Sequence, residues 1–134
     1  MDFKFLEPFR PQLLSVLRIM TGLLLFQYGV AKILKFPVLP YFANIPPLIT
    51  VAGTIELILG ALLVIGLFTR LTAFILSGQM AFAYFLGHVF KTGTPVWHPL
   101  NNGGTGAALF CFVCLYLASA GPGPWSVDAA RGKS

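Results

Sequence analysis

The stretch that decides the fold is TVAGTIELILGALLVIGLF, residues 50–68. It is apolar over about twenty residues, the length that a helix needs to cross the hydrocarbon core of a bilayer. One carboxylate, Glu56, lies inside it. Because an ionisable group at that depth is costly, such residues usually face a protein interior or a water-filled cavity. The stretch therefore predicts a membrane-spanning helix that carries one polar site.

The composition agrees with a membrane protein. Hydrophobic residues make up 57% of the 134 residues and charged residues only 10%, whereas roughly a quarter of a soluble domain is charged. The formal net charge is +5. The basic residues stand at the ends of apolar segments, which is typical of topology signals and of contacts with lipid headgroups. We therefore expect membrane lipids as partners and no nucleic acid.

Four apolar segments are each suited to a span, and they lie at residues 13–34, 48–68, 71–90 and 105–120. Together they predict an all-α membrane protein, an antiparallel bundle of four transmembrane helices in which residues 1–134 form one domain.

The remaining segments are expected to lie outside the spans. Residues 1–12 form an interfacial lead-in, the Pro-rich residues 35–47 and the polar residues 91–104 form loops, and Thr69 and Arg70 form a short turn. After Gly121, the Gly and Pro residues end the last helix and a short polar tail follows.

Four spans place both termini on one side of the membrane. That side carries Lys4, Arg10, Arg70, Arg131 and Lys133, and the other side carries Lys32, Lys35 and Lys91. The positive-inside rule then predicts a multi-pass protein of the inner cell membrane with both termini in the cytoplasm.

Small and polar residues share one face of each of the first two spans. These faces consist of Arg18, Gly22, Gly29 and Lys32 in the first span and of Thr50, Gly53, Glu56 and Gly60 in the second. Because small residues let helices approach closely, both faces are expected to contact other helices.

The third span has a polar face of its own, which includes Ser77, Tyr84 and His88. Gln79 lies nearly opposite, so we expect it to meet a different helix, the lipid interface or a partner subunit. The glycine-rich faces and the position of Gln79 together suggest a homo-oligomer.

An antiparallel arrangement puts Glu56 in the outer half of its span, nearer to Lys32 than to Arg18. Several further polar residues lie at a similar height, so we predict a cluster of Lys32, Glu56, His88 and Asn101 or Asn102, with Tyr84 beneath. One interpretation is a ligand site in which Glu56 and His88 exchange protons and Lys32 holds a negative oxygen. The other is a structural cluster that fixes the helix register, and the sequence leaves both open.

Two arginines and two cysteines have simpler interpretations. Arg18 is expected to extend to the inner interface or to contact the turn at Arg70, and Arg70 is expected to be a topology charge. Cys111 and Cys114 form a C-x-x-C pair in the middle of an apolar helix. Reactive pairs lie at a helix N-terminus, so these residues are interpreted as packing residues, with redox-active thiols as the weaker alternative. With two histidines and no further carboxylate within reach, we expect no metal site.

Several motifs, in this order, resemble the DoxX/DoxD-like family of small four-helix membrane proteins. They are LRIMTG (17–22), YGVAK (28–32), ELILGALLVIGLFTR (56–70), His88, NNGG (101–104) and GPGPWSVD (121–128). The resemblance implies a four-helix membrane bundle and a role linked to redox chemistry. Some relatives are parts of a thiosulfate:quinone oxidoreductase, others accompany thiol or oxidative-stress enzymes, and more distant ones are membrane assembly factors.

The resemblance and the polar cluster together give two functional expectations. The first is a redox-accessory membrane protein, an oxidoreductase subunit that contacts a quinone or another small lipophile and works with a soluble or membrane redox partner. The second is a non-catalytic membrane assembly factor or structural subunit. Whether the chain is itself an enzyme is left open by the sequence.

Overall fold

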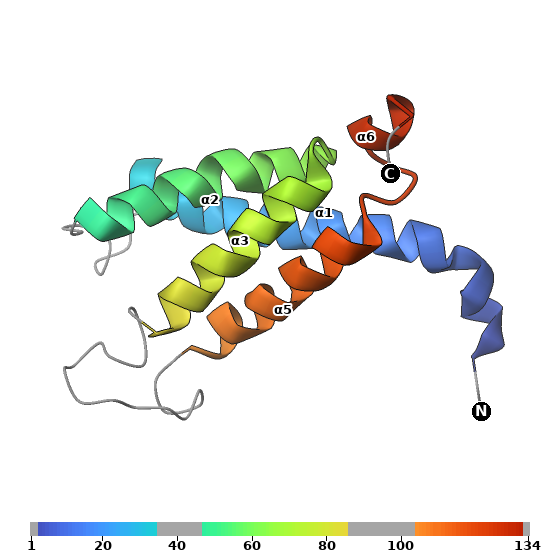
Figure 1. Ribbon diagram of the computed structural model, residues 1–134, viewed down its shortest axis with the longest axis horizontal. Helices are drawn as coiled ribbons and strands as arrows, with labels where there is room; N and C mark the ends of the chain where they lie inside the picture. Colours follow the sequence, from blue (N-terminus) through green and yellow to red (C-terminus); the bar gives the residue numbers. More distant parts are fainter. Residues whose placement is uncertain (1–2, 35–46, 86–103, 133–134) are drawn as a thin grey trace.

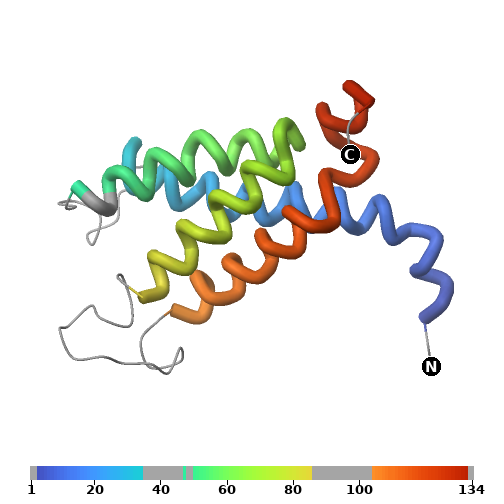
Figure 2. The backbone as a smooth tube through the Cα atoms, in the orientation of Figure 1, coloured from blue at the N-terminus to red at the C-terminus, as the bar shows by residue number. Residues whose placement is uncertain are grey.

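The structure is a computed structural model that describes residues 3–34, 47–85 and 104–132 (Figures 1 and 2). These residues form helices and turns and contain no strand, so the expectation of an all-helical protein is confirmed for them. The elements in chain order are η1 (Lys4–Phe9), α1 (Arg10–Gly29), η2 (Val30–Leu34), α2 (Pro47–Ile65), α3 (Thr69–Tyr84), α5 (Thr105–Ala120) and α6 (Val127–Ala130).

α1 begins at Arg10, which is earlier than the expected boundary at residue 13. Pro11 is in the first turn, where its missing N–H has no helical partner to lose, and its fixed φ favours the start of a helix. The preceding residues form the short 3₁₀ helix η1, in which all residues are exposed. The lead-in expected there is therefore helical and joins α1 directly.

α1 and α2 pack closely through their small residues. A Cβ atom on Gly22 would lie 2.8 Å from Val64 N, and one on Gly29 would lie 2.5 Å from Leu57 N. The two backbones are therefore in close contact at both places, as the small residues on the facing sides of the two helices predicted. Because the partner number on α2 falls as the residue number on α1 rises, the two helices are antiparallel. Gly60 belongs to the same contact, since its Cβ would lie 2.9 Å from Phe26 N.

The turn between α2 and α3 occurs earlier than expected. α2 ends at Ile65, and Gly66 adopts a left-handed φ of 73° while its N–H donates to Leu62 O at 2.9 Å. Glycine reaches this conformation without a steric cost and ends helices in this way. The turn predicted at Thr69 and Arg70 is therefore wrong, because Thr69 is already the first residue of α3, and α2 ends three residues before the predicted boundary at residue 68.

α3 and α5 form the second antiparallel pair. Near the middle of α3, the Ser77 hydroxyl donates to Cys111 O at 2.8 Å. At the start of α3, the Arg70 guanidinium donates to Ser119 O at 2.5 Å. The two pairs meet in one apolar core made of Leu25, Leu63, Ala73, Leu76, Met80, Cys114 and Leu117. In Figure 1, α2 lies over α1, and α3 lies next to α5.

The segment after α5 folds back instead of forming the expected polar tail. Gly121 ends α5 with a positive φ of 92°, and the chain then turns into α6. The Ser126 hydroxyl accepts a hydrogen bond from Ala129 N at 3.0 Å and so caps α6. The Asp128 N–H donates to Gly66 O at 2.9 Å. This segment therefore packs on the α2–α3 turn, at the end of the molecule where both termini lie (Figure 1).

Among the described residues, one continuous helical stretch, Lys4–Leu34, is long and apolar enough to cross a membrane. Thr50–Ile65 and Thr105–Ala120 are shorter apolar helices.

Candidate functional site

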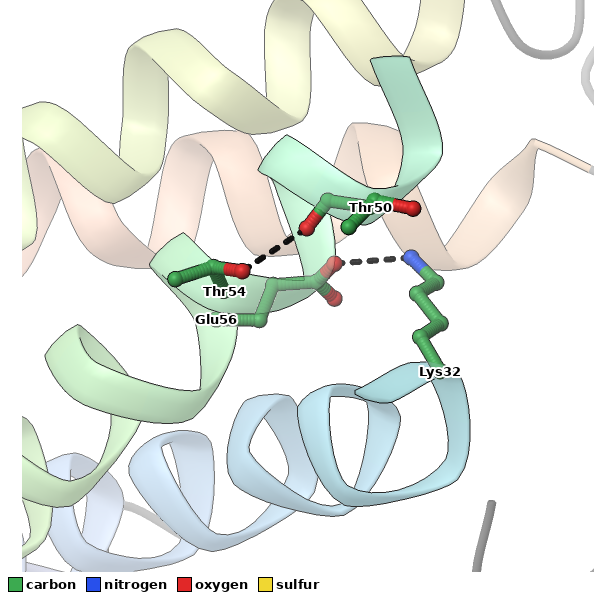
Figure 3. Close-up of polar contacts among 4 residues, drawn as sticks. All are labelled: Lys32, Thr50, Thr54 and Glu56. Atoms are coloured by element: carbon green, nitrogen blue, oxygen red, sulfur yellow. Dashed lines mark hydrogen bonds and ion pairs between the residues drawn. The ribbon is translucent and has the colours of Figure 1, made fainter. Parts of the chain in front are cut away.

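The polar site predicted around Glu56 contains an ion pair that joins two helical segments. Lys32 Nζ lies 2.7 Å from Glu56 Oε1, as Figure 3 shows. Lys32 comes from η2 and Glu56 from α2. The absence of a side chain at Gly53 allows this approach, because a Cβ there would lie 2.9 Å from Lys32 Cβ. The pairing of Lys32 with Glu56 that the sequence predicted is thus confirmed.

The two charges differ in their access to the surroundings. The Glu56 side chain is 2% exposed, whereas the Lys32 side chain is 17% exposed. The Lys32 ammonium also lies 5.7 Å from the centre of the Tyr28 ring, a distance at which a cation is attracted to an aromatic face. Tyr28 is itself exposed. The ammonium is therefore the outer part of the site and the carboxylate the inner part.

Gln79 on α3 is a third member of the site, which the sequence did not identify. Its side-chain amide lies near the Glu56 carboxylate, within range of an interaction with it. Its Oε1 atom is buried and has no hydrogen-bond partner among the described residues. Gln79 thus lies near Glu56 on α2, while the Ser77 hydroxyl donates to Cys111 O on α5. Of the three environments expected for Gln79, the structure shows the first, a different helix. The sequence feature that could have identified Gln79 as part of the site is its polar side chain, which stands apart from the other polar residues of the third span.

The other predicted members of the cluster fall into two groups. Tyr84 lies at the end of α3, and its half-buried ring packs edge-on against Phe85 with centroids 5.4 Å apart. His88, Asn101 and Asn102 lie outside the described residues. Thr54, which is close to Glu56 in Figure 3, donates to Thr50 O within its own helix at 2.9 Å. The ligand-binding and catalytic roles of these residues remain predictions.

Arg18 forms a second polar site near the chain termini. Its side chain is 0% exposed, so the expected extension to the interface is wrong. The guanidinium instead donates to four main-chain oxygens, those of Leu63 (2.9 Å), Val64 (3.3 Å), Trp125 (2.7 Å) and Pro122. Because the last carbonyls of a helix have no helical partner, the end of α2 offers acceptors to a buried donor. The alternative prediction, a contact near the α2–α3 turn, describes this position better.

Asp128 completes this end of the molecule from the C-terminal segment, and the sequence did not identify it either. Its carboxylate accepts hydrogen bonds from the N–H groups of Phe68 (3.0 Å) and Thr69 (2.8 Å). These groups open α3, where the helix dipole favours a negative charge. Burial raises the pKa of Asp128, but the hydrogen bonds from Thr69 and Phe68 and the charge of Arg131 together outweigh it, so the pKa lies below its usual range.

Arg70 has a structural contact in addition to its predicted role as a topology charge. Its guanidinium donates to Ala118 O at 3.1 Å and to Ser119 O at 2.5 Å, in the last turn of α5. A cation near the C-terminus of a helix is favourable for the same dipole reason. Arg18 and Arg70 therefore cap α2 and α5 respectively.

The two cysteines are free thiols in the middle of α5. Cys114 is 0% exposed and belongs to the apolar core. Cys111 is half-buried, and its Sγ lies 3.6 Å from the Ser77 hydroxyl. Neither thiol lies at a helix N-terminus, the position that activates redox-active cysteines. The placement agrees with packing residues. For metals, the described residues contain no group of three or more His, Cys, Asp or Glu side chains that is suited to binding an ion.

Closely packed apolar helices with a buried ion pair between them define a helical, membrane-associated class of protein. Comparison with known proteins identifies the family, because residues 13–89 match DoxX. The chain belongs to the DoxX family, as the motifs in the sequence suggested. It is 41% identical over 126 residues to an uncharacterized protein of Haemophilus influenzae, and the match covers 92% of this chain and 93% of that protein. No solved structure matches the chain.

Proposed function

We propose that the protein spans the membrane four times and binds a small lipophilic ligand at Lys32, Glu56 and Gln79, with a quinone as the first candidate. The observation that carries the proposal is the asymmetry of the ion pair, in which a partly exposed ammonium covers a buried carboxylate. An intramembrane charge pair at the edge of the protein is a typical position for a functional site.

The outer surfaces of the helices support four spans. Large apolar side chains are exposed on α3 and α5, among them Phe82 (68%), Leu109 (64%) and Phe112 (69%). Extended apolar surface of this kind indicates contact with lipid or with another protein. Because α1 and α2, and α3 and α5, are antiparallel, the helices α1, α2, α3 and α5 would form the proposed transmembrane bundle.

The orientation follows from the positive charges. Arg70 and Arg131 lie at the end of the molecule that holds both termini, and Lys4 and Arg10 are in the N-terminal region. The positive-inside rule places this end in the cytoplasm of a cell whose inner membrane holds the protein. The Lys32–Glu56 pair would then lie in the outer half of the bundle.

The chemistry of the site suits a ligand with polar oxygens. A Lys ammonium has three N–H donors, so Lys32 can hold a ligand oxygen while it keeps its bond to Glu56. Glu56 is positioned to take or return a proton, and His88 is the second proton-carrying group in the proposal. Tyr84, Asn101 and Asn102 would bind the rest of the ligand. Electrons would come from a soluble or membrane redox partner, which makes the protein a redox-accessory subunit.

The alternative is a structural role, for an assembly factor or a structural subunit. It is favoured by the position of the ion pair beside the Gly29–Leu57 and Gly53–Lys32 contacts, where it ties η2 to α2. A homo-oligomer also remains part of the proposal. However, the small face of α1 and the Gln79 side chain, which suggested it, make contacts within one chain.

The experiment is a binding titration of the purified protein in lipid nanodiscs with a short-chain ubiquinone. Lys32→Met and Glu56→Gln are each expected to weaken binding about tenfold or more, which is about 1.4 kcal/mol. Lys4→Met, which removes an exposed positive charge near the other end, serves as the control and should bind like the wild type. Unchanged affinity in both site variants, with a loss of thermal stability, would support the structural role instead.

A further inference from the structure

The starting observation is the unequal use of the two polar atoms of the Gln79 amide. The amide lies near the Glu56 carboxylate, and its Oε1 atom is buried without a hydrogen-bond partner in the described part of the chain. A buried acceptor without a hydrogen bond is costly, so such an atom needs an explanation. The position of Oε1 near Glu56, a group that can carry a proton, supplies that explanation.

An amide can bond to either protonation state of a neighbouring carboxyl group. Its NH₂ group donates to a carboxylate, and its oxygen accepts from the O–H of a carboxylic acid. A half-turn of the Gln79 amide would exchange the two atoms. The side chain is therefore suited to holding Glu56 in place both before and after it gains a proton.

The balance of charges at the site indicates that Glu56 would gain a proton when an anion pairs with Lys32. Lys32 and Glu56 are the charged side chains of the described residues in this half of the molecule, because the others lie towards the end with the termini. Two further titratable groups on the elements packed here are the phenols of Tyr28 on α1, whose ring centre lies 5.7 Å from the Lys32 ammonium, and of Tyr84, which lies further along α3 than Gln79. If an anion paired with Lys32 while Glu56 stayed ionised, the site would hold an uncompensated buried charge, which is strongly unfavourable.

We propose that the site binds a lipophilic weak acid with a phenol-like hydroxyl by exchanging one ion pair for another. The ligand O–H bond breaks, the proton moves to Glu56, and the ligand oxyanion replaces the carboxylate beside Lys32. Gln79 Oε1 then accepts the new Glu56 O–H. Among Lys32, Glu56 and the ligand, one positive and one negative charge are present before and after the exchange, no electron is transferred, and the proton stays with these three groups.

This inference rests on the proposed ligand site and narrows its substrate class. A hydroquinone carries the required hydroxyl groups, whereas a quinone offers only carbonyl acceptors and would leave the Lys32–Glu56 pair intact. The reduced form of a quinone would thus bind by ion-pair exchange. Gln79 is a positioning residue in this scheme, because it acts through Glu56.

The test uses 4-nitrophenol, whose anion and neutral form absorb at different wavelengths. The full-length protein in nanodiscs is titrated at a pH below that at which the free phenol ionises. We expect bound 4-nitrophenol to show the absorption of its anion. An infrared difference spectrum should show a new protonated-carboxyl band on binding, and this band should be absent in Glu56→Gln. The methyl ether 4-nitroanisole, which has no ionisable hydroxyl, should bind at least tenfold more weakly.

Variants separate the roles of the residues. Lys32→Met should remove the bound anion, and Gln79→Met should weaken anion binding about tenfold and shift its pH profile to lower pH. Ser77→Ala, on the opposite face of α3, should change neither. Anion binding of normal strength and pH dependence in Gln79→Met would overturn the role of Gln79.

The wild-type spectra alone also decide the proposal. Binding of the neutral phenol without a carboxyl band would overturn ion-pair exchange and leave the proposed ligand site standing. Failure of the wild type to bind both 4-nitrophenol and ubiquinone would remove the ligand site and the inference together.

Discussion

The Arg18 guanidinium donates to the main-chain oxygen of Pro122, which lies 104 residues later in the chain. This bond and the one to Trp125 O join α1 to the C-terminal segment, while the bonds to Leu63 O and Val64 O join it to the end of α2. A single side chain thus connects three segments. It does so through backbone oxygens, so the identity of those partner side chains matters little.

Replacing Arg18 with Lys is expected to destabilise the protein by about 3 kcal/mol or more, since each buried carbonyl left without a donor costs about 1–3 kcal/mol. A Lys ammonium keeps the charge but cannot reach the four oxygens that the planar guanidinium reaches. The measurement is the free energy of unfolding in mixed detergent micelles. Arg10→Lys, at an exposed position, is the matched control and should change little. Equal stability of the two variants would contradict the role of Arg18.

Asp128 predicts a dependence of stability on acid pH. Because the N–H groups of Phe68 and Thr69 keep the pKa of Asp128 below its usual range, its ionised form stabilises the fold at neutral pH. That contribution is lost as the pH falls below about 4, through the lowered pKa. Thermal unfolding between pH 7 and pH 3 should therefore show a steeper loss of stability in the wild type than in Asp128→Asn. Identical profiles would show that the carboxylate does not carry this effect.

Gly29 predicts the effect of separating α1 from α2. An alanine there would place Cβ 2.5 Å from Leu57 N, so Gly29→Ala should cost about 1–3 kcal/mol through overpacking. Gly78→Ala is the control with the opposite sign. Its Cβ would meet nothing within 4 Å, and alanine is favoured over glycine in a helix by about 1 kcal/mol. Chemical denaturation of both variants checks the prediction, and similar changes in the two would argue against the close contact.

The Lys32–Glu56 pair predicts partial rescue by a charge swap. Lys32→Glu alone places two carboxyl groups together, and breaking a buried pair costs about 3–5 kcal/mol. The double variant Lys32→Glu with Glu56→Lys restores the attraction and should recover part of that loss. A double-mutant cycle of unfolding free energies measures the coupling. Additive single effects would mean that the two charges do not interact.

The burial of Cys114 predicts slow reaction with thiol reagents. Cys114 is 0% exposed, so maleimide labelling of the native protein should be slow there and rapid only after denaturation. The double variant Cys111→Ala with Cys114→Ala should bind ubiquinone like the wild type, at a stability cost of about 1 kcal/mol. Loss of binding in a folded double variant would revive the redox interpretation of the pair.

The sequence predicted the ion pair well and for a physical reason. Helical spacing places Gly29 and Lys32 on one face and Gly53 and Glu56 on another, and an antiparallel pair of helices brings those faces together. The close approach of the two backbones could also be predicted, because glycines are easily recognised in an apolar segment and leave room for a neighbouring helix. The role of the site carries no such signal, since a ligand site and a structural pair use the same residue types.

The end of the molecule near the termini was harder to predict. The acceptors of Arg18 are carbonyl oxygens, which every residue has, so no pattern marks them. Asp128 lies next to its partners Phe68 and Thr69 only in the folded structure, because about 60 residues separate them in the sequence. The early end of α2 had a visible signal in Gly66, but the apolar residues Leu67 and Phe68 extended the expected helix past it.

The guanidinium of Arg18 also has a consequence for the order of events during synthesis. α1 leaves the ribosome before α2, and the oxygens of Pro122 and Trp125 are made more than a hundred residues after Arg18. α1 is therefore synthesised with a cation whose full set of partners does not yet exist. Arg18 can form its complete set of hydrogen bonds only late, after the C-terminal segment has been synthesised and has folded over its guanidinium.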